Sequence, residues 1–509
     1  DIFQIGKDNL TSGVTGTVSI GTTSTDLVDF DGRYYSVDGT LLVTSKSGEY
    51  ITFSGDGATT VKNADDSITF ATGTIVSGQN LTINSTGGAV SIASVMGSGT
   101  ATTLTINADK TAGGGDDTDE TVSIGAIGTA NEIGAVLIDA HDGITLTGDI
   151  TLADSAGADL DLDGKVLIDG SVTIDTDNTT NDGTISFETT IDGADGSGDN
   201  LTILAGDNDG DGTPGGALTL SGSIGDTTAL STLKINATAG DIALTIPQVG
   251  GGGAAGVTGQ VDIGNSNTAS ISMGSDTYDF GSGNVTLTGN TTFTQATPTV
   301  DMINASGDGG DFTITGTLTL NNGLLDVNTK GGNIEITGNI TSAGVDEALT
   351  LDDGTGTGTI TLGGTVSTGD ITLIGDSGIS LSGDITSNKT GSAGAIAITG
   401  PVTLADTASD SVTIDADQHA STTVTFNSTA TVNAAGAGGQ SLTIDTDGGA
   451  IAMQGAIGGS TALSALTINA DGAGTIEVAN IGASGVGVSG ATAIGNTNTA
   501  TLTLDGTVY

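Results

Sequence analysis

The chain has 509 residues, of which 86 are glycine, nine phenylalanine and five tyrosine, and it contains neither tryptophan nor cysteine. This composition excludes a large aromatic core, and the lack of cysteine excludes a disulfide framework and thiolate metal sites. The formal net charge of -51, from 60 acidic and nine basic residues, excludes a nucleic-acid partner because no basic stripe can neutralise phosphates. Since no run of about eighteen apolar residues occurs, we also expect no membrane insertion.

One stretch of sequence occurs three times along the chain. Its copies are VTGTVSIGTTSTDLVDFDGRYY, VTGQVDIGNSNTASISMGSDTY and VSGATAIGNTNTATLTLDGTVY, which end on Tyr35, Tyr278 and Tyr509. The spacing between these tyrosines gives one period of 243 residues and one of 231. We therefore divide the chain into the end of a preceding repeat (residues 1–35), a first long repeat (36–278) and a second (279–509). The third copy ends on the last residue, which favours a window of a longer polypeptide or a subunit that mimics one.

A second, shorter periodicity predicts β-strands. Apolar triplets with a central threonine recur between turns of glycine, asparagine, aspartate and serine, and in chain order examples begin at Leu81, Leu104, Ile144, Ile150, Val172, Leu218, Ile371 and Leu466. Because strand side chains alternate between faces, each triplet places two apolar groups on one side and a hydroxyl on the other.

These triplets predict an all-β chain that forms a right-handed parallel β-solenoid. A single triplet buries too little surface to be stable, but stacked coils of roughly 20 residues share one inner column of Val, Ile, Leu and Ala. A string of β-sandwich domains is the alternative fold. Sandwiches require broad inner faces with large residues, however, and the chain has few.

Three segments resemble the repeat regions of filamentous-haemagglutinin-like bacterial surface proteins, a class that includes giant adhesins. They are VTLTGNTTFT (residues 285–294), NITSAGVDEALTL (339–351) and TALSALTINADG (461–472). The resemblance implies a secreted, right-handed parallel β-helix that serves as an adhesin or extracellular fibre at the cell surface.

The acidic segment DNDGDG predicts a possible calcium site. Asp207, Asp209 and Asp211 supply oxygen ligands at alternate positions, and Gly212 permits a tight turn. The twelfth position is Leu218 instead of glutamate, so the segment is not an EF-hand. A solvated Asp-Gly turn is the alternative interpretation. For the acidic segment DGADGSGDN (residues 192–200) we expect a solvated loop.

The sequence predicts no enzyme. GDSG (residues 375–378) has the spelling of a serine-protease nucleophile, but the two histidines, His141 and His419, lie in turns of the periodic array. A carbohydrate-binding or carbohydrate-active β-helix protein remains the alternative function. Such a protein would need aromatic platforms and basic residues in a groove, and the only arginine is Arg33.

Together these features predict an extracellular structural fibre or adhesin stalk with a rigid, acidic surface. Unpaired strand edges at the ends of a solenoid invite continuation, so we expect self-association head-to-tail or laterally into filaments, a sheath or a surface layer. Glycans of a host or neighbouring cell are the other expected partners.

Overall fold

The structure is a computed structural model that describes most of the chain. The described residues are 2, 4–6, 14–64, 66–97, 102–108, 120–128, 131–155, 157–176, 181–206, 216–238, 244–251, 253–302, 309–406, 411–436, 439–483 and 486–509. Contacts divide the chain into two compact units: unit 1 comprises residues 1–250 and 256–269, and unit 2 comprises residues 251–255 and 270–509. Among the described residues all regular elements are β-strands. The described part of the chain contains no helix that is long and apolar enough to cross a membrane.

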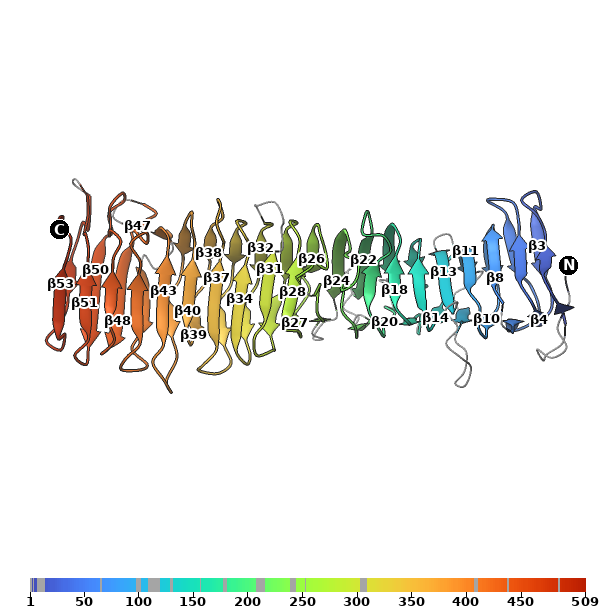
Figure 1. The fold of residues 1–509 in the computed structure, drawn as a ribbon, viewed down its shortest axis with the longest axis horizontal. Helices are drawn as coiled ribbons and strands as arrows, with labels where there is room; N and C mark the ends of the chain where they lie inside the picture. The colour runs from blue at the N-terminus through green and yellow to red at the C-terminus, as the bar shows by residue number, and fades with distance from the viewer. Residues whose placement is uncertain are drawn as a thin grey trace. The chain divides into compact units, whose positions relative to one another are not determined.

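Unit 1 contains parallel columns of strands in which each strand pairs with its counterpart one coil later (Figure 1). The first column is β1 (Val14–Thr15), β4 (Tyr34–Asp38), β7 (Thr59–Asn63), β10 (Leu81–Ser85), β12 (Thr103–Asn107), β14 (Ala135–Asp139), β17 (Leu160–Asp163), β20 (Ile185–Phe187) and β23 (Leu218–Leu220). The second column is β2 (Val18–Ile20), β5 (Leu41–Thr44), β8 (Ile68–Thr72), β11 (Val90–Gly97), β13 (Thr121–Ile127), β15 (Gly143–Leu146), β18 (Val166–Ile168) and β21 (Ile191–Gly193). The third column is β3 (Leu27–Phe30), β6 (Tyr50–Phe53), β9 (Thr74–Ser77), β16 (Ile150–Thr151), β19 (Ser171–Asp175), β22 (Asn200–Gly206), β24 (Thr232–Thr238) and β26 (Val261–Gly264). Between β9 and β16 this column continues through the long strands β11 and β13, which pair with both the second and the third column. Strand β25 (Leu244–Ile246) follows β24 along the chain.

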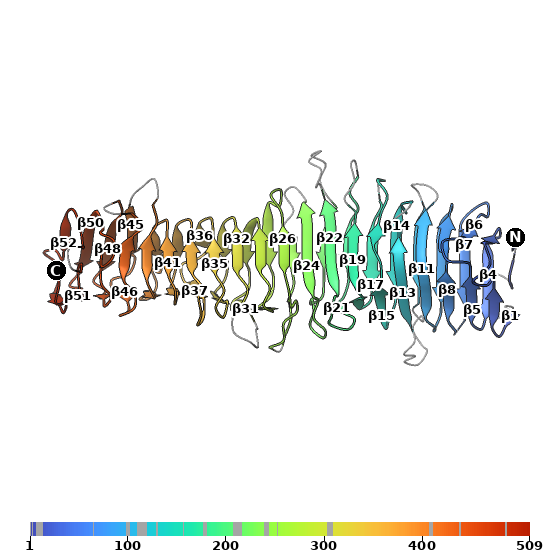
Figure 2. The same ribbon diagram turned by 90° about the horizontal axis from the view of Figure 1, so that it is seen from above.

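Unit 2 repeats the same architecture (Figure 2). One column is β27 (Ser270–Met273), β30 (Asn290–Phe293), β33 (Leu318–Leu320), β36 (Ile340–Ser342), β39 (Val366–Thr368), β42 (Ile385–Ser387), β45 (Ser411–Ala416), β48 (Ser441–Asp447), β50 (Ala465–Asp471) and β52 (Thr492–Ile494). The next is β28 (Thr277–Phe280), β31 (Thr299–Met302), β34 (Leu324–Asn328), β37 (Ala348–Asp352), β40 (Ile371–Ile374), β43 (Ala395–Thr399), β46 (Thr423–Phe426), β49 (Ile451–Met453), β51 (Thr475–Val478) and β53 (Thr501–Leu504). The last is β29 (Val285–Thr288), β32 (Phe312–Thr315), β35 (Ile334–Ile336), β38 (Ile360–Leu362), β41 (Ile379–Leu381), β44 (Val402–Leu404) and β47 (Val432–Ala434).

The predicted β-solenoid is therefore confirmed. The strands alternate between buried and outward residues as the triplets require, and the buried residues stack in register from coil to coil. One such column in unit 2 runs through Val285, Phe312, Ile334, Ile360, Ile379, Val402 and Val432, all of them buried. Successive members lie 19 to 30 residues apart, so many coils are longer than the predicted 20 because the turns absorb insertions. Each buried aliphatic side chain contributes about 1.5–3 kcal/mol.

The corners of the coils contain buried polar residues that bond to the backbone. Asn63 donates through Nδ2 to the carbonyl of Gly39 at 2.7 Å. Thr329 and Ser387 donate through their hydroxyls to the carbonyls of neighbouring glycines at 2.6 Å. Because a buried polar group without a partner is destabilising, these bonds allow the chain to turn inside the solenoid without solvent.

Outward asparagines connect one coil to the next. Asn333 accepts through Oδ1 from the backbone nitrogen of Thr359 at 3.0 Å, and Asn339 accepts in the same way from Thr365 at 3.0 Å. In each case the donor lies 26 residues later, at the start of a strand in the following coil. These bonds satisfy turn nitrogens that the parallel ladders leave free, so they help to hold the coils in register.

Candidate functional site

The acidic loop that we predict to bind calcium lies outside the described residues. Strand β22 ends at Gly206, and the described chain resumes at Gly216. Asp207, Asp209 and Asp211 fall between these positions. In the part of the chain that the structure describes, no group of three or more His, Asp or Glu side chains could hold a metal ion. The calcium site therefore stays a prediction.

The acidic segment at residues 192–200 corrects one expectation, because two of its carboxylates are buried. Asp192 lies 3.0 Å through Oδ2 from Nζ of Lys165 and accepts through Oδ1 from the backbone nitrogen of Thr227 at 3.0 Å. Asp199 accepts from the backbone nitrogen of Gly170 at 3.0 Å. These acids fasten neighbouring coils together. Their spacing from Lys165 and Gly170, about one coil, is the only sequence signal that could have identified them.

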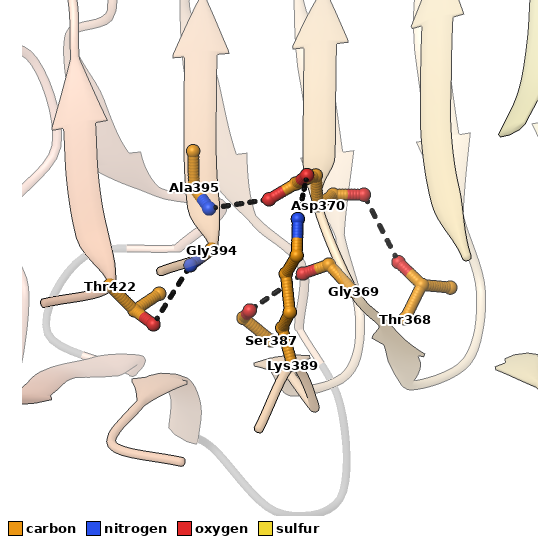
Figure 3. A network of polar contacts seen from close by, with 8 residues as sticks. All are labelled: Thr368, Gly369, Asp370, Ser387, Lys389, Gly394, Ala395 and Thr422. Atoms are coloured by element: carbon orange, nitrogen blue, oxygen red, sulfur yellow. Dashed lines mark hydrogen bonds and ion pairs between the residues drawn. The ribbon is translucent and has the colours of Figure 1, made fainter. Parts of the chain in front are cut away.

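A second ion pair fastens two coils of unit 2, as Figure 3 shows. Nζ of Lys389, just after β42, lies 2.7 Å from Oδ2 of Asp370, which precedes β40. The other oxygen of Asp370 accepts from the backbone nitrogen of Ala395 at 2.8 Å. Both carboxylate oxygens are thus occupied, and the pair serves to hold the turn after β42 against the preceding coil.

Several carboxylates with raised pKa values lie close together on neighbouring strands of unit 2. Burial is the largest cause of the raised pKa of Asp279, and neighbouring Asp301 adds to it. The pKa of Asp326 is raised by burial and by Asp352 and Asp301, although Lys330 opposes the change. These acids lie on adjacent strands, where Asp279 is directly opposite Asp301, whereas Asp326 is opposite Thr299 and Thr350. Carboxylates are therefore concentrated on these adjacent strands, where Lys330 pairs with Asp301 at 3.1 Å.

The three copies of the long repeat fold into the same turn. In the second copy, the backbone nitrogen of Asn265 donates to Oγ1 of Thr268 at 2.9 Å, and in the third Asn496 donates to Thr499 at 3.0 Å. The first copy uses Thr22 and Thr25 at 2.9 Å. In each copy a glycine with positive φ comes directly before this turn: Gly21 at 74°, Gly264 at 81° and Gly495 at 77°. The sequence repeat is thus a repeat of local structure.

The tyrosine that ends each copy also bonds in the same way. The hydroxyl of Tyr278 accepts from the backbone nitrogen of Ser275 at 2.8 Å, and the hydroxyls of Tyr35 and Tyr509 accept from Gly32 and Gly506, again three residues earlier. Burial raises the pKa of Tyr35 and of Tyr278. The bond closes the corner that leads from one coil into the next.

The third copy differs from the second in exposure. Ile271, Met273 and Tyr278 are each 0% exposed, whereas their counterparts Leu502, Leu504 and Tyr509 are 44%, 50% and 56% exposed. We call the surface formed by Ile494, Leu502, Leu504, Val508 and Tyr509 the end face. It borders an open hollow of about 550 Å³ that Ile481 and Val486 also line.

Strand edges at the end face are unpaired within the described part of the chain. β52 pairs with β50, and β53 pairs with β51. No described strand pairs with the opposite edge of either one.

The serine of the GDSG segment has an ordinary structural bond. Oγ of Ser377 donates to the carbonyl of Gly356 at 3.2 Å, in the preceding coil. Nδ1 of His419 accepts from the backbone nitrogen of Ser421 at 3.3 Å. Both side chains thus have partners in the backbone of turns.

Comparison of this chain with protein-family models, with curated proteins and with solved structures finds no match.

Proposed function

We propose that the chain is an extracellular structural element, a fibre or adhesin stalk whose role is to supply length and stiffness instead of catalysis. The observation that carries this proposal is the register of the buried columns, which runs through successive coils within each unit. Backbone ladders and a shared apolar interior resist bending because a bend would strain many coils at once.

The surface of the chain supports an extracellular location. A net charge of -51 keeps the surface of such a chain hydrated. The resemblance of three segments to filamentous-haemagglutinin-like repeats points to the same location. Glycans of host or neighbouring cells are the proposed partners of the adhesin. In this proposal the present chain is the stalk that holds the glycan-binding part of the adhesin away from the cell surface.

Electron microscopy of the purified chain tests the stalk proposal. We expect straight, narrow particles whose contour length varies little from one particle to the next. Particles that are compact, or that bend freely at many points along their length, would contradict it.

Calcium binding at Asp207, Asp209 and Asp211 is part of the proposal. Calcium at 100 times its Kd should stabilise the fold by about 2.7 kcal/mol, so a chelator should lower the Tm and excess calcium should restore it. The double variant Asp209→Asn, Asp211→Asn should lose this response, and Asp195→Asn, in another acidic loop, should keep it. Calorimetric titration gives the affinity directly. If magnesium or added NaCl raised the Tm as much as calcium does, the effect would be general screening of carboxylate repulsion and would contradict a calcium site.

A further inference from the structure

We propose that Asn322 is a site of spontaneous covalent modification, at which the backbone nitrogen of Gly323 displaces ammonia from the side-chain amide. Water then opens the cyclic product to aspartate or isoaspartate. The inference concerns the chemistry of one turn and does not depend on the proposed stalk function.

The reacting pair lies in a short turn of unit 2. Asn322 and Gly323 stand between Leu320, which ends β33, and Leu324, which begins β34. They form the only Asn-Gly pair in the sequence. Because glycine has no Cβ, its backbone nitrogen is unshielded, and asparagine is among the thermolabile residues of proteins. The nucleophile and the amide that it attacks are therefore adjacent in the chain.

Hydrogen bonds hold neither of the two reacting groups. The side chain of Asn322 is exposed, and it bonds to none of the residues that the structure describes. Among the same residues, no acceptor is bonded to the backbone nitrogen of Gly323. The next nitrogen along the chain, that of Leu324, donates to the carbonyl of Ala296 at 3.0 Å. The turn is thus anchored beside the pair, while the amide and the nitrogen that must meet are free to do so.

Asn427 shows the contrasting case of an asparagine whose amide is restrained. It also precedes a small residue, Ser428. Its Oδ1 accepts from the backbone nitrogens of Thr429 at 3.0 Å and of Ala430 at 3.1 Å. These bonds fix the side chain in a turn, so its approach to the following nitrogen requires local opening. Asn322 has no such restraint.

The fold requires both members of the pair. Asn322 has a φ of 121°, a conformation that residues with a Cβ rarely adopt and that asparagine tolerates better than most. A Cβ on Gly323 would overlap the carbonyl oxygen of Ala296 in the preceding coil, which excludes other residues at this position. The labile pair is therefore a consequence of the tight turn, because no bulkier residue that would slow the reaction fits after Asn322.

The reaction balances with water as the only co-reactant. The backbone nitrogen of Gly323 loses its proton to solvent base and forms a bond to Cγ of Asn322. The bond between Cγ and Nδ2 breaks, and the amide nitrogen takes up protons and leaves as ammonia. Hydrolysis of the resulting succinimide at Cγ gives aspartate, whereas hydrolysis at the main-chain carbonyl gives isoaspartate. Each product replaces NH2 by OH and adds one negative charge at neutral pH.

Isoaspartate lengthens the backbone by one atom beside two hydrogen bonds between coils. The nitrogen of Leu324 donates to Ala296 in the preceding coil, and the carbonyl of Gly323 accepts from the nitrogen of Ala348 in the following coil at 3.1 Å. An additional backbone atom at position 322 displaces both bonds, so the isoaspartate form should exchange the amide hydrogens of Leu324 and Ala348 faster. Since the spontaneous reaction does not restore asparagine, the converted fraction increases with the age of the protein.

Incubation of the folded chain at pH 8, followed by peptide mapping with mass spectrometry, tests the proposal. We expect the mass gain of an NH2-to-OH exchange at Asn322, with isoaspartate detected by an isoaspartyl methyltransferase. The rate at Asn322 should stay within about tenfold of its rate in the chain unfolded in urea, because no hydrogen bond has to open first. Folding should slow the reaction at Asn427 by a larger factor. The rate at Asn322 should also rise from pH 6 to pH 8, since the attacking nitrogen must lose its proton.

Two neighbouring variants assign the reaction to the pair. Asn322→Gln keeps an exposed amide but closes only a larger ring, so it should abolish the acidic form that ion exchange separates. Asn321→Gln changes the adjacent residue in the same turn, which precedes Asn322 instead of glycine, and should leave the reaction intact. Circular dichroism confirms that each variant is folded. A folded chain that keeps Asn322 intact while the chain in urea converts it would overturn the proposal. Conversion to aspartate without isoaspartate would also overturn it, because direct hydrolysis of the amide would then be the reaction.

Discussion

Replacing Phe53 by alanine should lower the free energy of unfolding of unit 1 by about 3–5 kcal/mol, the cost of removing a fully buried aromatic ring. Phe53 stacks on Phe30 with ring centroids 4.9 Å apart and planes at 12°, and it meets Phe70 edge-on at 6.1 Å. It thus connects three successive coils through ring contacts, with Phe30 on β3, Phe53 on β6 and Phe70 on β8. A cavity at its position would separate all three.

Denaturant unfolding followed by circular dichroism measures this effect, and hydrogen exchange locates it. Because each coil contacts only its neighbours, the lost protection should centre on β3, β6 and β9 and decline along the coils of unit 1. Phe53→Leu keeps most of the apolar volume and should cost far less. A loss below about 1 kcal/mol for Phe53→Ala would show that the contacts of this ring do not hold these coils together.

Asp353→Asn should stabilise the protein above pH 6 and leave its stability at pH 4 almost unchanged. Asp353 occupies a corner and is 0% exposed. Its Oδ1 accepts from the backbone nitrogen of Asp376 at 3.0 Å, but its Oδ2 has no hydrogen-bond partner among the residues that the structure describes. Burial, with the charges of Asp376 and Asp352, raises the pKa of Asp353 from 3.8 to about 6.

The direction of the effect follows from this pKa. Between pH 4 and pH 6 the folded state holds a proton that the unfolded state has released, so stability falls as the pH rises through this interval. Above pH 6 the carboxylate is ionised in both states, and the resulting loss in the free energy of unfolding reaches its full value of about 2–3 kcal/mol. Asparagine removes the charge, and Asn63 shows that a buried amide can be accommodated at a corner of this solenoid.

Denaturant unfolding at several pH values checks this prediction. The difference between Asp353→Asn and the unaltered chain should grow from pH 4 to pH 6 and then level off. Asp346→Asn, which removes a charge from an exposed turn, is the control and should show no such growth. A stability difference that is the same at every pH would mean that the ionisation of Asp353 does not destabilise the folded state.

The sequence predicted the fold well because the evidence for it is local. A triplet such as Leu104 to Ile106 shows which side chains face inward, whatever lies next to it, and its recurrence implies stacking.

The acidic residues were harder to interpret from the sequence. Asp192 and Asp199 read as members of a solvated loop, yet both are buried against the preceding coil. Their burial depends on which residue of another coil lies beside them. That pairing varies because the coils differ in length, so composition and spacing along the chain do not reveal it.

The sequence by itself determined that this chain is an acidic β-solenoid with a repeated coil, because alternation of side chains and turn residues are properties of short segments. Only the tertiary structure decided which carboxylates are buried and that, among the described residues, Oδ2 of Asp353 has no hydrogen-bond partner. The physical reason is that burial is a property of contacts between coils.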